Sequence, residues 1–473
     1  MKPVLDLLAR ERGVRPDERG WQRIAEWRDW WLGEYKPFHR YRERTAAGGV
    51  MERPIYSMRM AKKICEDWSS ILLGEHPEIS VPHEPSRRFL LGEDGRGGVL
   101  GDCRFWQHAA ALIELAFYSG TGAMVLRLQG VRTSTNGRIL PGAGKPWLQC
   151  LPATNIVPLT VHDGEILEAA FCSETLENGR RTLYLETHTL ENGSYVIENR
   201  CLRRQSGGLY ETDLPEGVAR RFVTGSSVPL FCILRPGGVG AGMPEGMGEA
   251  VFAGAIDNLK GVDLAFHNFC RDFLLGGKKV FYNRSLLQEE DGMLLAPDDV
   301  CQQLFLNVGD KLPGEAQLIY EHNPALRVQE NIDGLQAQLD YLSLKCGLGA
   351  KYYRFDAPAV TATQYVGDRQ ELVRSAARHG AALQSALWSA LRMLLWAGRA
   401  VCGAGTDEDC GVCVRLDDSV ITSRESLREQ DRADVAAGLL LPHEYRMRWY
   451  GETREEAVAA LSGKRKEETD AAH

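Results

Sequence analysis

The second half of the chain holds two segments in which apolar residues recur at helical spacing. In the first, residues 329–345, these residues stand three or four positions apart and form one stripe. The stripe consists of Ile332, Leu335, Leu339 and Leu342. Glycines just past a periodic segment usually end a helix, as Gly347 and Gly349 would here. The second segment, 364–397, keeps the period for about 34 residues, or roughly 50 Å of helix. Typical helices have about 11 residues, so the pattern predicts a helix pair of the kind found in large assemblies.

Further helices are predicted on both sides of this pair. Near the N-terminus Trp21, Trp27 and Trp31 fall close to one helical face, which favours an amphipathic helix docked on a larger body over an aromatic ligand cage. After a glycine-rich stretch at 235–248, bulky residues at every seventh position predict another long helix. These residues are Phe252, Leu259, Phe266 and Phe273. The remaining predicted helices cover 60–73, 105–118 and 424–437, with two more beginning at Pro442 and after Thr453.

Between residues 123 and 235 the apolar period changes from about 3.6 to 2, which is typical of strands. The predicted strands are 123–128, 147–151, 166–171, 181–189, 194–200 and 228–234. Asn192-Gly193 is a strong signal for a tight turn between two of them. We therefore expect a mostly antiparallel β region inside an α+β protein. No charged constellation in this region suggests chemistry.

Length, composition and charge narrow the class of protein. A chain of 473 residues can form two or three cores, and 44% hydrophobic with 25% charged residues is ordinary for a folded soluble protein. The net charge of −8 argues against a broad basic face that grips nucleic acid, yet it suits a conduit whose walls repel phosphates. No run approaches the ~18 apolar residues of a membrane helix. The N-terminus also lacks a signal-peptide pattern, so a cytoplasmic location is the default expectation.

Twelve cysteines are scattered along the chain, and several lie inside apolar runs. A disulfide framework belongs to small secreted domains, so we expect reduced thiols here. Cys410 and Cys413, with Cys402 nearby, have the spacing of a zinc knuckle, and His443 is the closest candidate for a further ligand. A second ligand pair is missing from the local sequence. We therefore favour a structural role in which Cys413 faces inward from a strand, and we expect no bound metal.

Other motifs fail as catalytic or nucleotide sites. The glycine-rich run 237–242 is not followed by Gly-Lys-Ser/Thr, and the Gly-x-Gly-Lys run ending at Lys145 continues with Pro146 instead of a hydroxyl. Asp417 and Asp418 are adjacent on a predicted strand and would point to opposite faces. The sequence thus offers no catalytic site and no cofactor site, and we expect the protein not to be an enzyme.

The loop between the two helices, 349–363, combines basic and aromatic residues without helical period. Its simplest interpretation is a packed connection between helices. If the loop is exposed, Lys351 or Arg354 would meet phosphates while the aromatic side chains anchor the backbone. The candidate residues are Lys351, Tyr352, Tyr353, Arg354 and Phe355.

The order of features around this loop resembles the portal proteins of tailed bacteriophages. Those proteins form the ring at a capsid vertex through which DNA enters and leaves. The shared features are a helix with a glycine-rich end, Tyr-Tyr-x-Phe-Asp at 352–356, Thr-Ala-Thr-Gln at 361–364, and a long helix. The resemblance extends over about residues 35–462 and is most specific between 245 and 397. A short clip insert and the many cysteines depart from the family.

The resemblance implies a division of the chain into portal regions. Residues 1–244 would form the wing, 245–275 the first stem helix and 276–328 the clip. The second stem helix would be 329–348, and the channel loop would be 349–363. A long wing helix at 364–399 and a helical crown at 400–473 would complete the chain. In this division the loop residues Lys351 to Phe355 face the central channel.

The resemblance also implies partners and a location. The chain would form a homo-oligomeric ring, usually of twelve subunits, with a formal charge of twelve times −8, or −96. Double-stranded DNA would pass through it. The large terminase subunit would dock at the clip near Lys278, Lys279 and Arg284, and head-completion or adaptor proteins would bind later. Major capsid and scaffold proteins are further expected partners. The ring would assemble in the host cytoplasm and reside in the virion, at the capsid vertex, without membrane contact.

Two other interpretations remain open from the sequence. One is a helical scaffold or adaptor of a phage particle that never closes into a ring. The other is an enzyme with a cysteine-based metal site in the C-terminal region.

Overall fold

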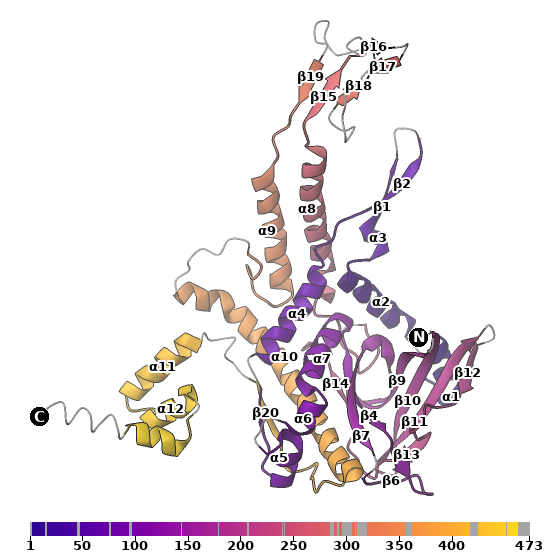
Figure 1. Cartoon of the computed structure of the whole chain (residues 1–473), viewed down its shortest axis with the longest axis vertical. Coiled ribbons are helices and arrows are strands. Elements are labelled where there is room, and N and C mark those ends of the chain that lie inside the picture. The colour runs from indigo at the N-terminus through magenta and orange to yellow at the C-terminus, as the bar shows by residue number, and fades with distance from the viewer. Residues whose placement is uncertain are drawn as a thin grey trace, which may run out of the picture.

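The computed structural model describes residues 2–14, 17–44, 48–74, 77–93, 97–142, 144–177, 179–205, 208–238, 240, 242–283, 288–290, 293–295, 305–307, 309, 319–354, 362–416, 424–450 and 452–461. Helices and mostly antiparallel sheets occur together, in agreement with an α+β protein. A pair of helices projects from a body in which helices pack against sheets (Figure 1). None of the helices in these ranges is long and apolar enough to cross a membrane.

The N-terminal part of the chain covers the body with helices. Ile24, Trp27 and Trp30 of one helix are buried in the main core, so the predicted docking of this helix on a larger body is confirmed. Asp17 caps its first turn, and Gly33 ends it with a positive φ of 72°. The elements here are α1 (Lys2–Arg12), α2 (Glu18–Leu32), α3 (Lys36–His39), β1 (Arg40–Arg44), β2 (Val50–Pro54) and α4 (Met60–Leu73).

A second group of helices supports the centre of the core. The predicted helix at 105–118 is confirmed as α7, whose apolar face packs against α4 and against a three-stranded sheet. Trp68 of α4 and Phe117 of α7 are both fully buried at this junction. The helices of this group are α5 (Glu84–Leu91), α6 (Gly98–Asp102) and α7 (Phe105–Ser119).

The predicted β region forms two antiparallel sheets. The smaller has the order β14-β4-β7, with β4 (Gly122–Gln129), β7 (Lys145–Pro152) and β14 (Phe231–Leu234). The larger runs β12-β11-β10-β9-β8, and β13 also pairs with β11. Its strands are β8 (Ile156–His162), β9 (Glu165–Glu177), β10 (Arg180–Glu191), β11 (Ser194–Gln205), β12 (Gly208–Thr212) and β13 (Arg221–Val223). Asn192 and Gly193 form the predicted turn with φ values of 50° and 77°, as a tight hairpin of this kind requires.

Short elements complete the body. A 3-10 turn, Ala153–Asn155, links β7 to β8. Two minor sheets pair β3 (Glu78–Ser80) with β20 (Cys413–Arg415) and β5 (Arg132–Thr133) with β6 (Ile139–Leu140).

A buried ionic cluster joins the two main sheets, a feature that the sequence pattern did not reveal. Arg127 of β4 donates to the carboxylate of Glu186 on β10, and His188 Nε2 lies 2.5 Å from the other oxygen of that carboxylate. Arg127 Nε also donates to Gln149 Oε1 at 3.1 Å. Burial by itself raises the pKa of Glu186, but Arg127 and His188 outweigh it and lower that pKa overall. The cluster is closed to solvent and links β4 of one sheet with β10 of the other.

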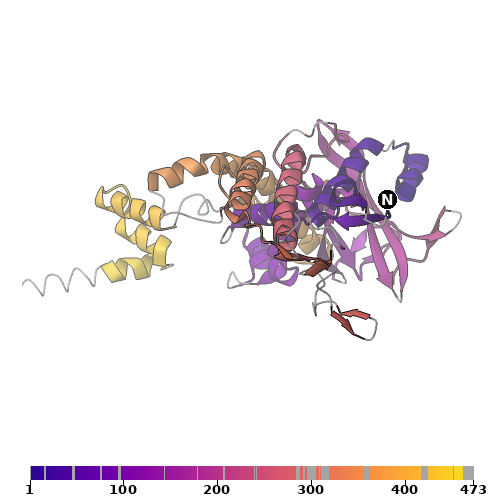
Figure 2. The same ribbon diagram turned by 90° about the horizontal axis from the view of Figure 1, so that it is seen from above.

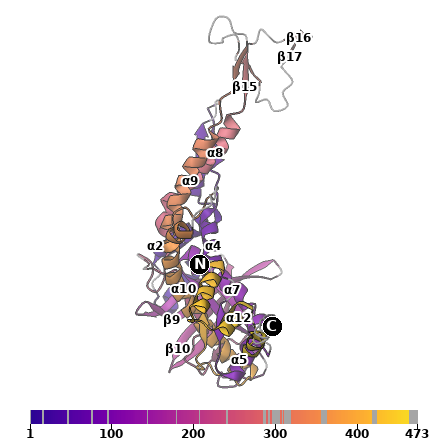
Figure 3. The same cartoon turned by 90° about the vertical axis from the view of Figure 1, so that its left-hand side faces the viewer.

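The projecting pair consists of α8 (Ile256–Leu275) and α9 (Val328–Lys345), which pack side by side (Figures 1 and 3). The predicted helix around 252–273 starts later than expected, because Phe252 lies before the short 3-10 turn Ala253–Ala255 and is fully buried in the body. Strands lie beyond the free end of the pair: β15 (Lys279–Tyr282), β16 (Gln288–Glu290), β17 (Met293–Leu295), β18 (Phe305–Asn307) and β19 (Ile319–His322).

The predicted long helix is confirmed as α10 (Ala362–Ala397), with 36 residues. Its C-terminal half crosses the core, where residues 390, 391 and 393–397 are all fully buried. A π-helical segment, Gly398–Cys402, follows. The helices α11 (Arg424–Ala436) and α12 (Pro442–Tyr450) lie to the side of the body, as Figure 2 shows from above. Residues 454–461 form a last helix, and the Thr453–Glu456 hydrogen bonds confirm the predicted cap.

The junction of α10 with α4 and α7 predicts a pH dependence of stability. His379 is 2% exposed, its ring lies against Trp68 and Phe117, and its Nδ1 accepts the Gly237 N–H at 2.8 Å. Burial, with a smaller effect of Arg378, lowers the pKa of His379 from 6.5 to about 4. The unfolded chain therefore binds one more proton between these pH values. The free energy of unfolding should fall by about 3 kcal/mol as the pH drops through this window.

We expect His379→Asn to remove most of this fall, because an amide oxygen can still accept the Gly237 N–H but does not become charged. Urea unfolding at about pH 7 and about pH 4.5 measures the difference. His162→Asn is the matched control, since the side chain of His162 is 75% exposed. A His379 variant that loses stability with acid as steeply as the parent protein would contradict this account.

Candidate functional site

The loop after α9 begins where the helix ends in the sequence Cys346-Gly347-Leu348-Gly349. Lys351 is exposed and has a positive φ of 68°, which is rare for a residue with a side chain. Tyr352 is 39% exposed, and Arg354 is half-buried. Phe355 lies outside the described residues, as does the rest of the predicted channel loop up to residue 361.

Tyr353 fixes the start of this loop to α4. Its hydroxyl donates to Asp67 Oδ2 at 2.8 Å, and Lys63 pairs with the same carboxylate. Gln336 of α9 donates to the Tyr353 carbonyl oxygen at 2.7 Å. Burial raises the pKa of Tyr353 far above its usual value, and the adjacent Asp67 raises it further. The hydroxyl therefore stays protonated and remains a donor to Asp67.

The end of α9 is fixed in the same place. Trp68 Nε1 donates to the Cys346 carbonyl oxygen at 3.2 Å. Of the five predicted channel-loop residues, Tyr353 is thus an anchor, as expected for an aromatic side chain there, and Lys351 is more exposed than Arg354. The contact of Lys351 and Arg354 with DNA remains a prediction.

A buried carboxylate on α8 holds the segment 39–58, here called the N-terminal arm, against that helix. Asp263 Oδ2 lies 2.9 Å from His39 Nε2 and accepts the Ser57 hydroxyl at 2.9 Å, while Oδ1 accepts the Met58 N–H at 2.8 Å. One and two turns further along α8, His267 Nδ1 accepts the Tyr56 N–H, and Arg271 donates to the Tyr41 hydroxyl at 2.8 Å. The sequence pattern gives no sign of this cluster, because its members are about two hundred positions apart.

The helix pair exposes apolar side chains away from its mutual contact. On α9, Leu335, Leu339 and Leu342 are buried, whereas Tyr341 is 60% exposed. The exposed apolar residues of the pair are Leu264, Phe273, Leu274 and Leu275 on α8 and Val328, Tyr341 and Leu344 on α9. These side chains are spread along the pair, with Phe273, Leu274, Leu275 and Val328 at its free end and Tyr341 and Leu344 nearer the body.

The predicted clip residues lie beyond the free end of the pair. Lys278 pairs with Glu321 at 2.7 Å, so its charge is partly neutralised. Lys279 is half-buried on β15, which pairs with β18 and β19. Arg284 lies outside the described residues. Docking of a terminase at this end remains a prediction.

The prediction that Cys413 faces inward from its strand is wrong. The strand β20 buries Val414. Because neighbouring side chains on a strand point to opposite faces, Cys413 lies on the exposed face. Cys402 is exposed and Cys410 is half-buried. Within the described part of the chain, no three or more His, Cys, Asp and Glu residues come together as a metal site.

The glycine-rich segment before α8 allows neighbouring parts of the chain to approach its backbone closely. A side chain at Gly237 would meet Arg378 at 2.6 Å, and one at Gly240 would meet the Met247 carbonyl oxygen at 2.8 Å. Gly237 also borders a hollow of about 370 Å³ that the end of α9 and part of α10 line on the other side, with Lys345 and Glu371 among the lining residues. The segment thus brings the helices together.

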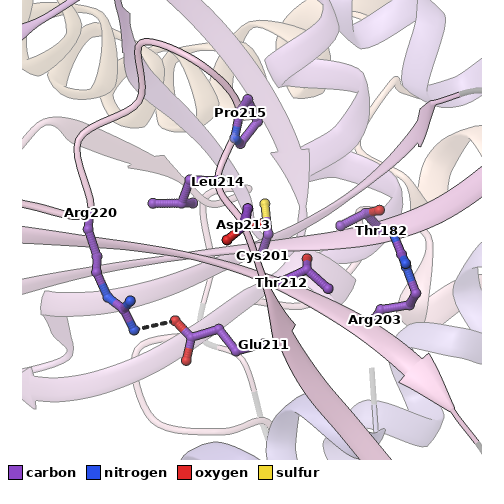
Figure 4. Close-up of a pocket in the computed structure, with 9 residues that line it drawn as sticks. All are labelled: Thr182, Cys201, Arg203, Glu211, Thr212, Asp213, Leu214, Pro215 and Arg220. Atoms are coloured by element: carbon purple, nitrogen blue, oxygen red, sulfur yellow. Dashed lines mark hydrogen bonds and ion pairs between the residues drawn. The ribbon is translucent and has the colours of Figure 1, made fainter.

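A larger hollow of about 800 Å³ lies on the sheet formed by β10, β11 and β12 (Figure 4). Glu211 and Arg220 form an ion pair across part of it, with an N–O distance of 2.6 Å. The lining residues are Thr182, Cys201, Arg203, Glu211, Thr212, Asp213, Leu214, Pro215 and Arg220. They include no histidine that could act as a base beside Cys201. The arrangement is a polar surface hollow, remote in sequence from the loop and the helix pair.

The anchoring of the loop can be tested by removing one oxygen atom. We expect Tyr353→Phe to lower the free energy of unfolding by about 1.5–3 kcal/mol, the usual value of a hydrogen bond to a charged group. Amide hydrogen exchange should become faster at 346–354 and stay unchanged in the sheets. Urea unfolding and exchange mass spectrometry give the two readings. Tyr210→Phe is the control, since Tyr210 is 48% exposed on β12; equal effects of both variants would exclude the anchoring role.

Comparison with models of protein families gave no match to this chain, and comparison with curated proteins gave none either.

Proposed function

We propose that this chain is the portal subunit of a tailed bacteriophage, and that a ring of its copies, usually twelve, surrounds the channel for double-stranded DNA. The observation that carries the proposal is the projecting pair α8–α9 with apolar residues on its free faces. A chain that worked alone in water would leave these residues uncovered. Copies standing side by side around an axis would bury them.

A ring follows from the symmetry of such a contact. When two different faces of each copy meet, the contact repeats from copy to copy and closes if the rotation allows. The pair α8–α9 would then form a stem that surrounds the channel. The strands β15 to β19 would form the clip at one end of the stem, and α11 and α12 would belong to the crown.

In this proposal the loop after α9 approaches the DNA. Lys351 and Arg354 would contact phosphates, which fixes position without reading sequence. The net charge of −8 per chain keeps the rest of the wall repulsive, so DNA can slide. Tyr353, held by Asp67, would keep the start of the loop in place.

The partners in this proposal dock on different parts of the ring. The large terminase subunit would bind the clip around Lys278, Lys279 and Arg284 and would supply ATP hydrolysis, while the portal subunit catalyses nothing. Head-completion or adaptor proteins would bind the same end later. Major capsid and scaffold proteins would surround the wing, which places the ring in the virion, at a capsid vertex.

The proposal is tested first by the size of the purified protein. We expect native mass spectrometry and negative-stain images to show closed rings with a central hole, with about twelve copies as the usual number in the family that the sequence resembles. A monomer at high protein concentration would overturn the portal proposal and favour a helical adaptor that does not form rings.

The role of the loop is tested with Lys351→Ala combined with Arg354→Ala. We expect intact rings but a several-fold loss of packaged or retained DNA, because each lost phosphate contact weakens binding. A packaging reaction with nuclease-protected DNA as the readout measures this loss. Arg88→Ala with Arg415→Ala removes two exposed charges elsewhere and serves as the control. Unchanged packaging by the loop variant would count against the channel position of the loop.

A further inference from the structure

The hairpin of β1 and β2 lies against α8 with one face only. Tyr41 accepts a hydrogen bond from Arg271, and Glu43 pairs with Arg53 and lies 3.9 Å from Arg271. In the described part of the chain the two strands pair with each other and with no third strand. All five residues of β2 are exposed. Both the outer edges and the outer face of the hairpin are thus open to a partner.

The outer face of the hairpin is basic. Arg40, Arg42 and Arg44 alternate with half-buried residues along β1, so all three point away from α8. Each of them is exposed and has no carboxylate within ion-pair distance among the described residues. Glu52 is the only acid opposite them in the register, across from Arg42. Val50, which is 65% exposed, lies across from Arg44 and adds an apolar contact.

The free face of α9 is acidic where the hairpin face is basic. Its inner face buries Leu335, Leu339 and Leu342, and the stripe on the other side contains Glu330, Asp333, Ala337, Tyr341 and Leu344. From Val328 to Leu344 the helix has three acidic residues and no lysine or arginine. This free face is therefore acidic toward one end and apolar toward the other.

The two surfaces lie at the same height along the stem. Asp272 of α8 accepts hydrogen bonds from Arg327 and Asn331 of α9, so residue 333 is level with the part of α8 that holds the hairpin. That part contains His267 and Arg271. Figure 1 shows α9, α8 and the hairpin in a row, with α8 in the middle. The basic face of the hairpin and the acidic end of α9 thus lie on opposite sides of α8. Both are level with residues 267–272 of that helix.

We propose that the β1–β2 hairpin of one copy packs on the free face of α9 in the next copy. The inference rests on the proposed ring and names the surfaces by which neighbours meet. Rotation about the ring axis keeps every residue at its height, so surfaces that meet in a ring must lie at equal height, as these do. Arginines on the hairpin face Glu330 and Asp333, and this charge complementarity sets the register of the contact.

Charge reversal on each surface provides the test. The first variant combines Arg42→Glu with Arg44→Glu, and the second combines Glu330→Arg with Asp333→Arg. Each variant alone presents like charges at every contact, so the fraction of protein in rings should fall at least tenfold. A mixture of the two variants restores opposite charges at every contact. It should form rings of alternating copies, which native mass spectrometry identifies by their intermediate mass.

The quadruple variant should also form rings, because its surfaces are complementary with both signs exchanged. The control combines Arg88→Glu with Arg415→Glu, which changes the net charge as the first variant does but at exposed sites on α5 and β20, away from the hairpin and α9. Circular dichroism and thermal unfolding show whether each variant remains folded.

The outcomes separate this inference from the proposed function. Rings formed equally well by each single-surface variant would overturn the hairpin contact and leave the portal proposal intact. Folded variants that fail alone and also fail as a mixture would overturn it too, because charge complementarity would then not govern the contact. A parent protein that forms no ring would overturn the portal proposal itself.

Discussion

The attachment of α8 to the N-terminal part of the chain depends on the carboxylate of Asp263. This side chain is 6% exposed and has three hydrogen-bond partners, all from a segment more than two hundred residues earlier in the chain. A buried carboxylate is stable only when its oxygens are paired. The requirement therefore fixes the N-terminal arm, and with it the hairpin, at one position along α8.

The projecting pair α8–α9 joins the main core through Leu259 and Val262 of α8 and Leu335, Leu339 and Leu342 of α9. Each of the two helices buries one face, and most of the stability of a helix in a protein comes from such packing. Packing against a neighbouring copy would add buried area where a single chain has none. In that arrangement the stability of the stem depends on the concentration of copies, as it does in any obligate oligomer. The body, with its continuous core from α2 to α10, does not have this dependence.

Periodic features of the structure could be predicted from the sequence, and polar contacts between distant residues could not. The stripe of Leu335, Leu339 and Leu342 predicted α9, and Asn192-Gly193 predicted a turn, because both signals are local. Neither the contact of Asp263 with His39 nor the pairing of Arg127 with Glu186 has a local signal. Cys413 was assigned to the wrong face of its strand, since a short strand can be assigned in either phase and burial of Val414 decides between them. In the loop, residue types indicated an anchor, but only the position of Asp67 shows that Tyr353 is that anchor.

The continuity of α10 has a mechanical consequence. The helix contains no proline and runs without a break for 36 residues from the loop region into the core, about 54 Å at 1.5 Å per residue. A rod of this kind bends little, so a sideways force at its first turn acts as a torque on its far end. That end is held by Leu391, Leu394 and Trp396, all fully buried. Displacement of the first turn would thus strain the packed side chains at the far end of α10, deep in the body.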